Sequence, residues 1–423
     1  MVASTDIKVF VHTNNNAPQL QNAYGSMINV LDACLVNGIN IGSISSLTAS
    51  GVTVTALFSS AHNLMQYQVI KITGAAQSEF NGEHRVLTVP NAQSVTFELA
   101  SVPSAGSATG VISASLPPLG WEKPFSSTNE AGGGKAAYRS TNLLLPSRPF
   151  LRVVDEPDSS YTTTYAKYAK VGIVEDMTDI NTMLGVQAPY DAAAPTKNWV
   201  GTGSGTAAYN GWAKWYYATG ADFKAYNTDS NAVTSGNRAW VIIGNTDYFY
   251  ILPTAISLNT NHITYGFGAF KSLLLTDSSN TFLSATRVYQ TASIRDYKPQ
   301  NTPLSSDVLS NKLILQRLFN QTANQSEATV LSLKVSVDDI YSGYSNYINA
   351  SILTNVAPFA ALIAKEVSNN VIRGEIPNIF WLFQIKPYNH LQVFEKNRVL
   401  YIAINIAHYN GYEGQIIYKI GEL

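Results

Sequence analysis

The sequence has 423 residues, a mass of 45.9 kDa and a formal net charge of −1, and only 13% of its residues are charged, about half of the roughly 25% that is usual. The balance of 27 Lys and Arg against 28 Asp and Glu argues against a nucleic-acid-binding protein, which would need a basic surface. The single cysteine, Cys34, excludes a disulfide scaffold. With 45% hydrophobic residues, 24 Tyr, 16 Phe and 6 Trp, the chain can build sizeable cores, and its length suggests several domains.

The N-terminal segment predicts a strand followed by an amphipathic helix. Residues 7–12 have a strand-like composition, and residues 14–18 predict a turn. Asn22 is a candidate N-cap and Gly38 a candidate C-terminal glycine of the helix. One apolar face is formed at helical spacing by Tyr24, Met27, Ile28, Leu31, Cys34 and Leu35.

No targeting or membrane-spanning segment is expected. The first ten residues lack a basic region followed by an apolar one, so we expect no signal peptide. The best apolar run, 356–364, is too short for a span and contains Pro358. We therefore expect a buried helix or strand there and no membrane insertion.

Residues 44–115 predict a small all-β module, a barrel or sandwich, inserted after the N-terminal strand and helix. Short alternating runs are separated by turn signals such as Asn81-Gly82 and Pro90-Asn91, which is typical of such modules. The predicted strands are 52–58, 67–72, 84–89, 94–99 and 110–113.

Residues 116–295 predict a mixed segment rich in Trp and Tyr. We interpret 117–125 as a turn-rich anchor, 129–134 as a loop tip and 191–211 as a loop. Residues 245–247 predict a hairpin turn. The predicted strands are 137–139, 150–155, 168–175, 239–245, 248–252 and 273–275.

The remaining residues, 296–423, begin with a linker rich in Pro, Asn and Ser. Two short helices are predicted at 308–319 and 338–352. The alternation over 400–407 and the return at 415–420 predict a terminal β-hairpin. The fold class is therefore mainly β with a few helices (α+β) and multidomain. The predicted domains are 1–43 plus 116–295 (a docking domain), 44–115 (the β module) and 296–423 (the C-terminal domain).

Residues with catalytic potential do not form a recognisable motif. No two of the six histidines lie within five residues of each other, so no metal-binding spacing exists and we interpret them as surface histidines of loops and strands. No G-x-S-x-G elbow is present, and the glycine-rich stretch 201–206 lacks the Lys of a phosphate loop. The histidines are His12, His62, His84, His262, His390 and His408.

The sequence contains two clusters of carboxylate side chains. Paired carboxylates can hydrolyse glycosides or bind Ca²⁺, but neither cluster has the EF-hand spacing, and solvated or capping acids are the more ordinary interpretation. We expect no catalytic residue, no metal and no cofactor. The clusters are Asp155, Glu156 and Asp158, and Glu175, Asp176 and Asp179.

Aromatic side chains are densest over residues 209–217. Such a stretch can stack on a sugar, or it can form a strand buried in the core or at a subunit interface, where Tyr and Trp are enriched, and core or interface is the more ordinary interpretation. The candidate aromatic interface surface consists of Trp121, Trp212, Trp215, Tyr216, Tyr217 and Trp240.

Several blocks in fixed order resemble a family of tailed-bacteriophage virion structural proteins. Residues 16–38, which end in LDACLVNG, resemble the opening helix of the family, and the β module, with Ser60-Ala-His62 and 80–86, resembles a small domain that recurs in phage virion proteins. The next blocks are 120–125 (GWEKPF) with 137–139, Val174-Glu-Asp-Met177, and 238–240 with 248–250. Two blocks depart from the family pattern: Val174 replaces an aromatic residue, and Ala239 replaces a proline.

The resemblance implies a virion component without enzymatic activity. We expect a structural protein of the tail or the tail–head connection, assembled in the host cytoplasm into multimers with itself and neighbouring virion proteins. The alternatives are a head decoration or fibre protein, a carbohydrate-binding receptor tip that uses the aromatic residues to bind a host-surface glycan, and a polysaccharide depolymerase that uses Glu175 or Asp176.

Overall fold

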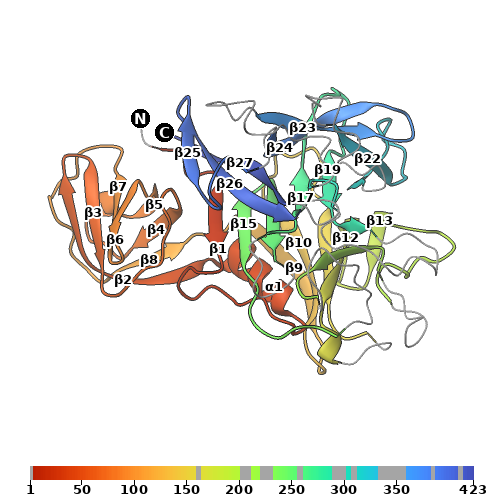
Figure 1. The fold of residues 1–423 in the computed structure, drawn as a ribbon, viewed down its shortest axis with the longest axis horizontal. Coiled ribbons are helices and arrows are strands. Elements are labelled where there is room, and N and C mark those ends of the chain that lie inside the picture. The colour runs from red at the N-terminus through yellow and green to blue at the C-terminus, as the bar shows by residue number, and fades with distance from the viewer. Residues whose placement is uncertain are drawn as a thin grey trace.

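The computed structural model is mainly β, and its strands form three sheets (Figure 1). It describes residues 3–158, 163–200, 211–219, 232–254, 261–287, 302–305, 312–331, 359–382, 386–407 and 413–423. All strand pairings within the described sheets are antiparallel. Sheets of this kind suit a chain rich in Tyr, Thr, Val and Ile.

The largest sheet has 13 strands in the described part of the chain. It joins the N-terminal strand to the C-terminal half, since β1 pairs with β15. In sheet order the strands are β1 (Lys8–Val11), β15 (Trp240–Gly244), β16 (Tyr248–Pro253), β17 (Tyr265–Ala269), β19 (Thr281–Ser284), β21 (Leu313–Leu315), β22 (Ser326–Leu331), β23 (Phe359–Glu366), β24 (Ile372–Leu382), β27 (Glu413–Glu422), β26 (Val399–Ala407) and β25 (Val393–Lys396), with β18 (Lys271–Ser272) beside β24.

A second sheet of seven strands packs against the large one. Its strands, in order, are β20 (Thr286–Arg287), β14 (Ala213–Tyr216), β12 (Tyr168–Met177), β11 (Phe150–Asp155), β10 (Gly134–Ser140) and β9 (Trp121–Thr128), with β13 (Met183–Ala188) paired to β12. A short 3-10 turn, η3 (Thr163–Tyr165), precedes β12.

The third sheet, also of seven strands, is built from residues 39–116 and lies to one side of the molecule (Figure 1). The sequence pattern missed its longest strand, β2, because Ile residues alternate there with Ser and Asn, and it merged β5 and β6 into one run. The order is β5 (Gly82–Arg85), β4 (Val69–Thr73), β8 (Ile112–Leu116), β2 (Ile39–Ser50), β3 (Thr53–Phe58), β7 (Ser94–Glu98) and β6 (Thr88–Asn91), with a 3-10 turn η2 (Ser78–Phe80).

The buried residues of this small sheet belong to the same hydrophobic cluster as those between the two larger sheets. Polar contacts add to this attachment. The side-chain amides of Asn14 and Gln68 pair reciprocally at 3.0 Å, and Lys8 lies 3.0 Å from Glu83. The small sheet is therefore anchored to the segment around β1.

The predicted N-terminal helix is present but starts later than expected. It consists of α1 (Ser26–Leu31) and a π-helical continuation, η1 (Asp32–Asn37). Gly25, with φ of 84°, precedes the first turn in place of the expected cap Asn22, because a left-handed residue redirects the chain there. Gly38 ends the helix as predicted.

Three predicted elements are wrong. Residues 273–275 form a bend and turn, because the chain folds back so that Asp277 binds the buried guanidinium of Arg373 at 2.9 Å. Trp121–Phe125, expected in a turn, belong to β9. The helix expected at 308–319 is replaced over its described part by β21 and a turn, because Leu313–Leu315 pair with β19 and β22. The helix expected at 338–352 lies outside the described residues.

Candidate functional site

The six candidate aromatic residues are buried within a single chain, which agrees with the core interpretation and not with an exposed aromatic surface. Trp215 on β14 shows why. Its ring stacks on Tyr265 of β17 with centroids 5.9 Å apart, and its indole N–H donates to Ser284 O at 2.9 Å. The interface between the two larger sheets provides both the apolar area and the hydrogen-bond acceptor that a Trp needs.

The other candidate aromatic residues lie in the same core or at its edge. Trp121 contacts Phe249 edge-to-face at 5.2 Å, and its N–H donates to Asn245 O at 2.8 Å. Trp240 donates to Pro18 O at 3.0 Å, and the Tyr217 hydroxyl donates to Asp155 at 2.7 Å. With Trp212 and Tyr216 also buried, a receptor tip built from residues 212–217 is excluded in this conformation.

The first carboxylate cluster is dispersed among internal contacts. Asp155 is fully buried, and burial raises its pKa to about 7, although hydrogen bonds from the Tyr217 hydroxyl and the backbone around Met27 act in the opposite direction. Asp158 forms a buried ion pair with Lys170 at 3.1 Å. Glu156 lies 3.5 Å from Lys135. The expectation of solvated acids is thus wrong for Asp155 and Asp158, but Asp155 does accept from backbone N–H groups at the start of α1, as a capping acid does.

Glu175 in the second cluster is held by four hydrogen bonds. Arg317 donates to both carboxylate oxygens at 2.7 Å, Gln316 donates at 3.1 Å, and the Val186 N–H donates at 2.9 Å. Burial alone would raise the pKa of Glu175, but the hydrogen bonds from Arg317 and Val186 outweigh it and hold the pKa below its usual range. Glu175 and Asp176 are consecutive on β12, so they do not face each other as a glycosidase pair would.

The histidines also differ from the prediction. His62, His84 and His262 are buried, and His262 stacks on His390 with ring centroids 5.0 Å apart. Their sequence separation concealed this pairing, since strands bring distant residues together. In the part of the chain that the structure describes, no group of three His, Cys, Asp or Glu side chains has a geometry suited to a metal ion.

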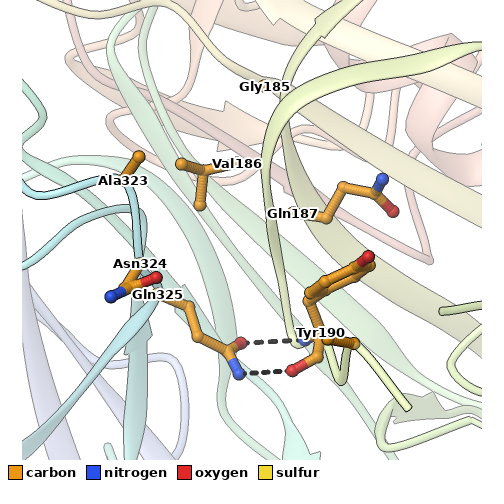
Figure 2. Close-up of a pocket in the computed structure, with 8 residues that line it drawn as sticks. Gly185, Val186, Gln187, Tyr190, Ala323, Asn324 and Gln325 are labelled. Atoms are coloured by element: carbon orange, nitrogen blue, oxygen red, sulfur yellow. Dashed lines mark hydrogen bonds between the residues drawn. The ribbon is translucent and has the colours of Figure 1, made fainter. Parts of the chain in front are cut away.

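A polar pocket of about 460 Å³ lies between β13 with its following turn and the turn that precedes β22 (Figure 2). Gln325 spans the two walls: its Oε1 accepts from the Tyr190 N–H at 2.9 Å, and its Nε2 donates to Tyr190 O at 2.8 Å. The lining residues are Gly185, Val186, Gln187, Tyr190, Ala192, Ala323, Asn324 and Gln325.

Sequence reasoning missed this pocket. Tyr190 and Gln325 are 135 residues apart, and neither belongs to a recognised motif. The only local signal is a pair of polar turns that contain Tyr, Gln and Asn, which is too common to indicate a site. The glycine-rich stretch 201–206 lies outside the described residues.

Comparisons with known proteins give little further information. No protein-family model matches the chain, and no curated protein matches it significantly. Among solved structures the chain is similar to a phage phi92 endosialidase, with 8% identity and a TM-score of 0.15, over 91% of this chain and 52% of that chain. The chain thus spans about half the length of that protein, and at this TM-score the match carries no argument. Across the described residues, every helix is too short or too polar to cross a membrane.

Proposed function

We propose that this chain is a structural component of a tailed-bacteriophage virion that acts by multimeric assembly and without catalysis. The tail or the tail–head connection is the proposed position, and a head decoration or fibre protein is the alternative. The proposed partners are further copies of the chain and neighbouring virion proteins. The ordered sequence blocks support this assignment, and the carboxylates with catalytic potential are occupied by internal contacts.

The observation that carries the proposal is a set of exposed leucines held in defined positions. Leu143 and Leu144, in the loop between β10 and β11, are 78% and 92% exposed. The loop is fixed, because the Asn142 side chain donates to Asp247 at 2.8 Å and accepts from the Leu144 N–H at 3.0 Å. A contiguous patch of exposed apolar side chains is typical of a surface that a partner covers, and Leu143 and Leu144 are consecutive.

A second fixed turn adds to this surface. Leu275 is fully exposed after β18, and the same turn is tied to β24 by the bond from Leu273 N–H to Arg373 O at 2.9 Å. The Asp247 that holds the first segment also accepts, through its backbone O, from the N–H of Ala269 at the end of β17, at 2.9 Å. We define the assembly surface as Leu143, Leu144, Leu273 and Leu275.

The proposal is tested on the purified chain and on particles. We expect multimers in sedimentation velocity, and we expect the double variant Leu144→Ser/Leu275→Ser to shift the chain toward monomer. Val111→Ser, at an exposed position just before β8 of the small sheet, is the matched control and should leave the distribution unchanged. A monomeric wild-type chain, together with its absence from purified virions by mass spectrometry, would refute the proposal.

A further inference from the structure

We infer that the pocket between β13 and the turn at 323–325 binds a neutral oligosaccharide. This site is separate from the assembly surface and adds a binding function to the proposed structural role. Its volume of about 460 Å³ lies within the range of roughly 300–1,000 Å³ that is usual for ligand pockets.

The lining chemistry favours an uncharged, hydroxyl-rich ligand. The described lining residues contribute the side-chain amides of Gln187, Asn324 and Gln325 and no charged group. An amide both donates and accepts hydrogen bonds, as a sugar hydroxyl does. The nearest ion pair, Glu175 with Arg317, is satisfied internally through two bonds of 2.7 Å, so it offers no free charge to an anionic ligand.

Tyr190 supplies the aromatic surface of the pocket. It is 39% exposed, whereas the aromatic residues of 212–217 are buried. Figure 2 shows the Tyr190 ring and the Gln187 side chain extending to the same side of the chain. The Gln187 Oε1 is buried and has no hydrogen-bond partner among the described residues. The Tyr190 ring and the Gln187 amide give this side of the chain an apolar face beside a polar group, which suits the apolar face and the hydroxyl edge of a sugar.

The pocket walls are fixed before any ligand binds. Gln325 holds the Tyr190 backbone through two hydrogen bonds. Glu175 provides a further connection. It accepts a hydrogen bond from the Val186 N–H of one wall, and it also binds Arg317, which lies in the segment that leads to the turn at 323–325 of the other wall. Because both walls are tied in two places, binding costs little ordering entropy.

The test measures binding of maltohexaose, cellohexaose and isomaltohexaose to the full chain by saturation-transfer NMR and calorimetry, with a sialic acid oligomer as the anionic comparison. We expect at least one neutral hexasaccharide to bind. Tyr190→Ala should weaken binding about tenfold or more, and Asn324→Ala should weaken it less. Gln93→Ala, an exposed amide on the small sheet, should change nothing.

Three results would overturn the inference: no neutral sugar binds, only the anionic oligomer binds, or Tyr190→Ala binds as the wild type does. The melting temperature of Tyr190→Ala is measured alongside, so that a loss of binding is distinguished from a loss of folding. Particle incorporation is measured independently, so failure here is distinguishable from failure of the virion assignment.

Discussion

His262 lies in the interior between β16 and β26, and its ring Nδ1 is 2.6 Å from Leu252 O. Burial, followed by the neighbouring His390, lowers its pKa to about 3. Burial and the nearby His12 and Lys386 lower the pKa of His390 to about 4. The unfolded chain therefore binds more protons than the folded chain below about pH 6.5, and stability should decrease as the pH falls through this window.

Asp155 acts in the opposite direction over the same pH range. Its pKa of about 7 is raised mainly by burial, so the folded chain retains a proton that the unfolded chain loses above about pH 4. This contribution to stability is fully present below the unfolded pKa and decreases as the pH rises toward 7. The wild-type profile sums both effects, and single variants separate them.

We predict that His262→Phe reduces the loss of unfolding free energy between pH 7.5 and pH 4.5 by about 2 to 3 kcal/mol, from about 1.4 kcal/mol per pKa unit. Asp155→Asn should increase that loss. Urea denaturation at the two pH values measures both. If the unfolding free energy changes equally with pH in the wild type and in His262→Phe, then His262 titrates in the folded chain as it does in the unfolded chain.

At the scale of elements, the turn between β9 and β10 is closely fitted to the start of α1. Gly133 has φ of 68°, and a Cβ at this position would lie 2.0 Å from Asp155 O and 2.8 Å from Gly25 N. Gly51 has a similar φ of 63° with open space around it. Substitutions at the two glycines can therefore be compared to distinguish the cost of backbone strain from the cost of steric contact.

We predict that Gly133→Ala lowers the free energy of unfolding by more than about 2 kcal/mol, because the turn must move away from both the end of β11 and the start of α1. Gly51→Ala should cost about 1 kcal/mol from the left-handed conformation alone. Chemical denaturation at pH 7.5 compares them. Equal losses of unfolding free energy in the two variants would mean that steric contact adds no cost at Gly133.

Sequence patterns correctly predicted the elements whose structure is determined by local hydrophobic periodicity. The alternation of Leu400, Ile402, Ile404 and Ile406 predicted β26, and its pairing with β27 is confirmed. The pattern failed where a tertiary contact decides: the apolar spacing around Leu313 fits a helix, but two neighbouring strands pair with it. The aromatic residues were recognised as important, but composition does not distinguish an interior from a surface. The pocket could not be predicted because it depends on residue pairs, such as Tyr190 and Gln325, that are distant in sequence.

At the scale of the whole molecule, Arg85 connects the small sheet to the rest of the chain. Its Nε donates to Ser4 O at 2.5 Å, its Nη2 to Ile7 O at 3.1 Å and its Nη1 to Tyr67 O at 2.7 Å. The guanidinium also lies against Gly421 of β27, where a Cβ would be 2.6 Å from Nη2. One buried side chain thus links the small sheet, the N-terminal segment and the last strand.

We predict that Arg85→Met lowers the free energy of unfolding by about 2 to 4 kcal/mol, because several backbone carbonyls lose a charged donor. Amide hydrogen exchange should increase around residues 4–12 more than in the second sheet. Lys71→Met, at an exposed position on β4, is the control and should cost little. Unchanged exchange near Ser4 after loss of Arg85 would contradict this linking role.

The contact between Ser4 and Glu422 has a consequence for biosynthesis. Ser4 N–H donates to Glu422 O at 2.8 Å, the Ser4 hydroxyl accepts from the Glu422 N–H at 2.9 Å, and Figure 1 shows both ends on the same side. The two residues are 418 positions apart, so a ribosome adds Glu422 only after more than four hundred further codons. The segment around Ser4 must therefore wait without this partner while the intervening residues are made, and this interval is when a chaperone would be most useful to it.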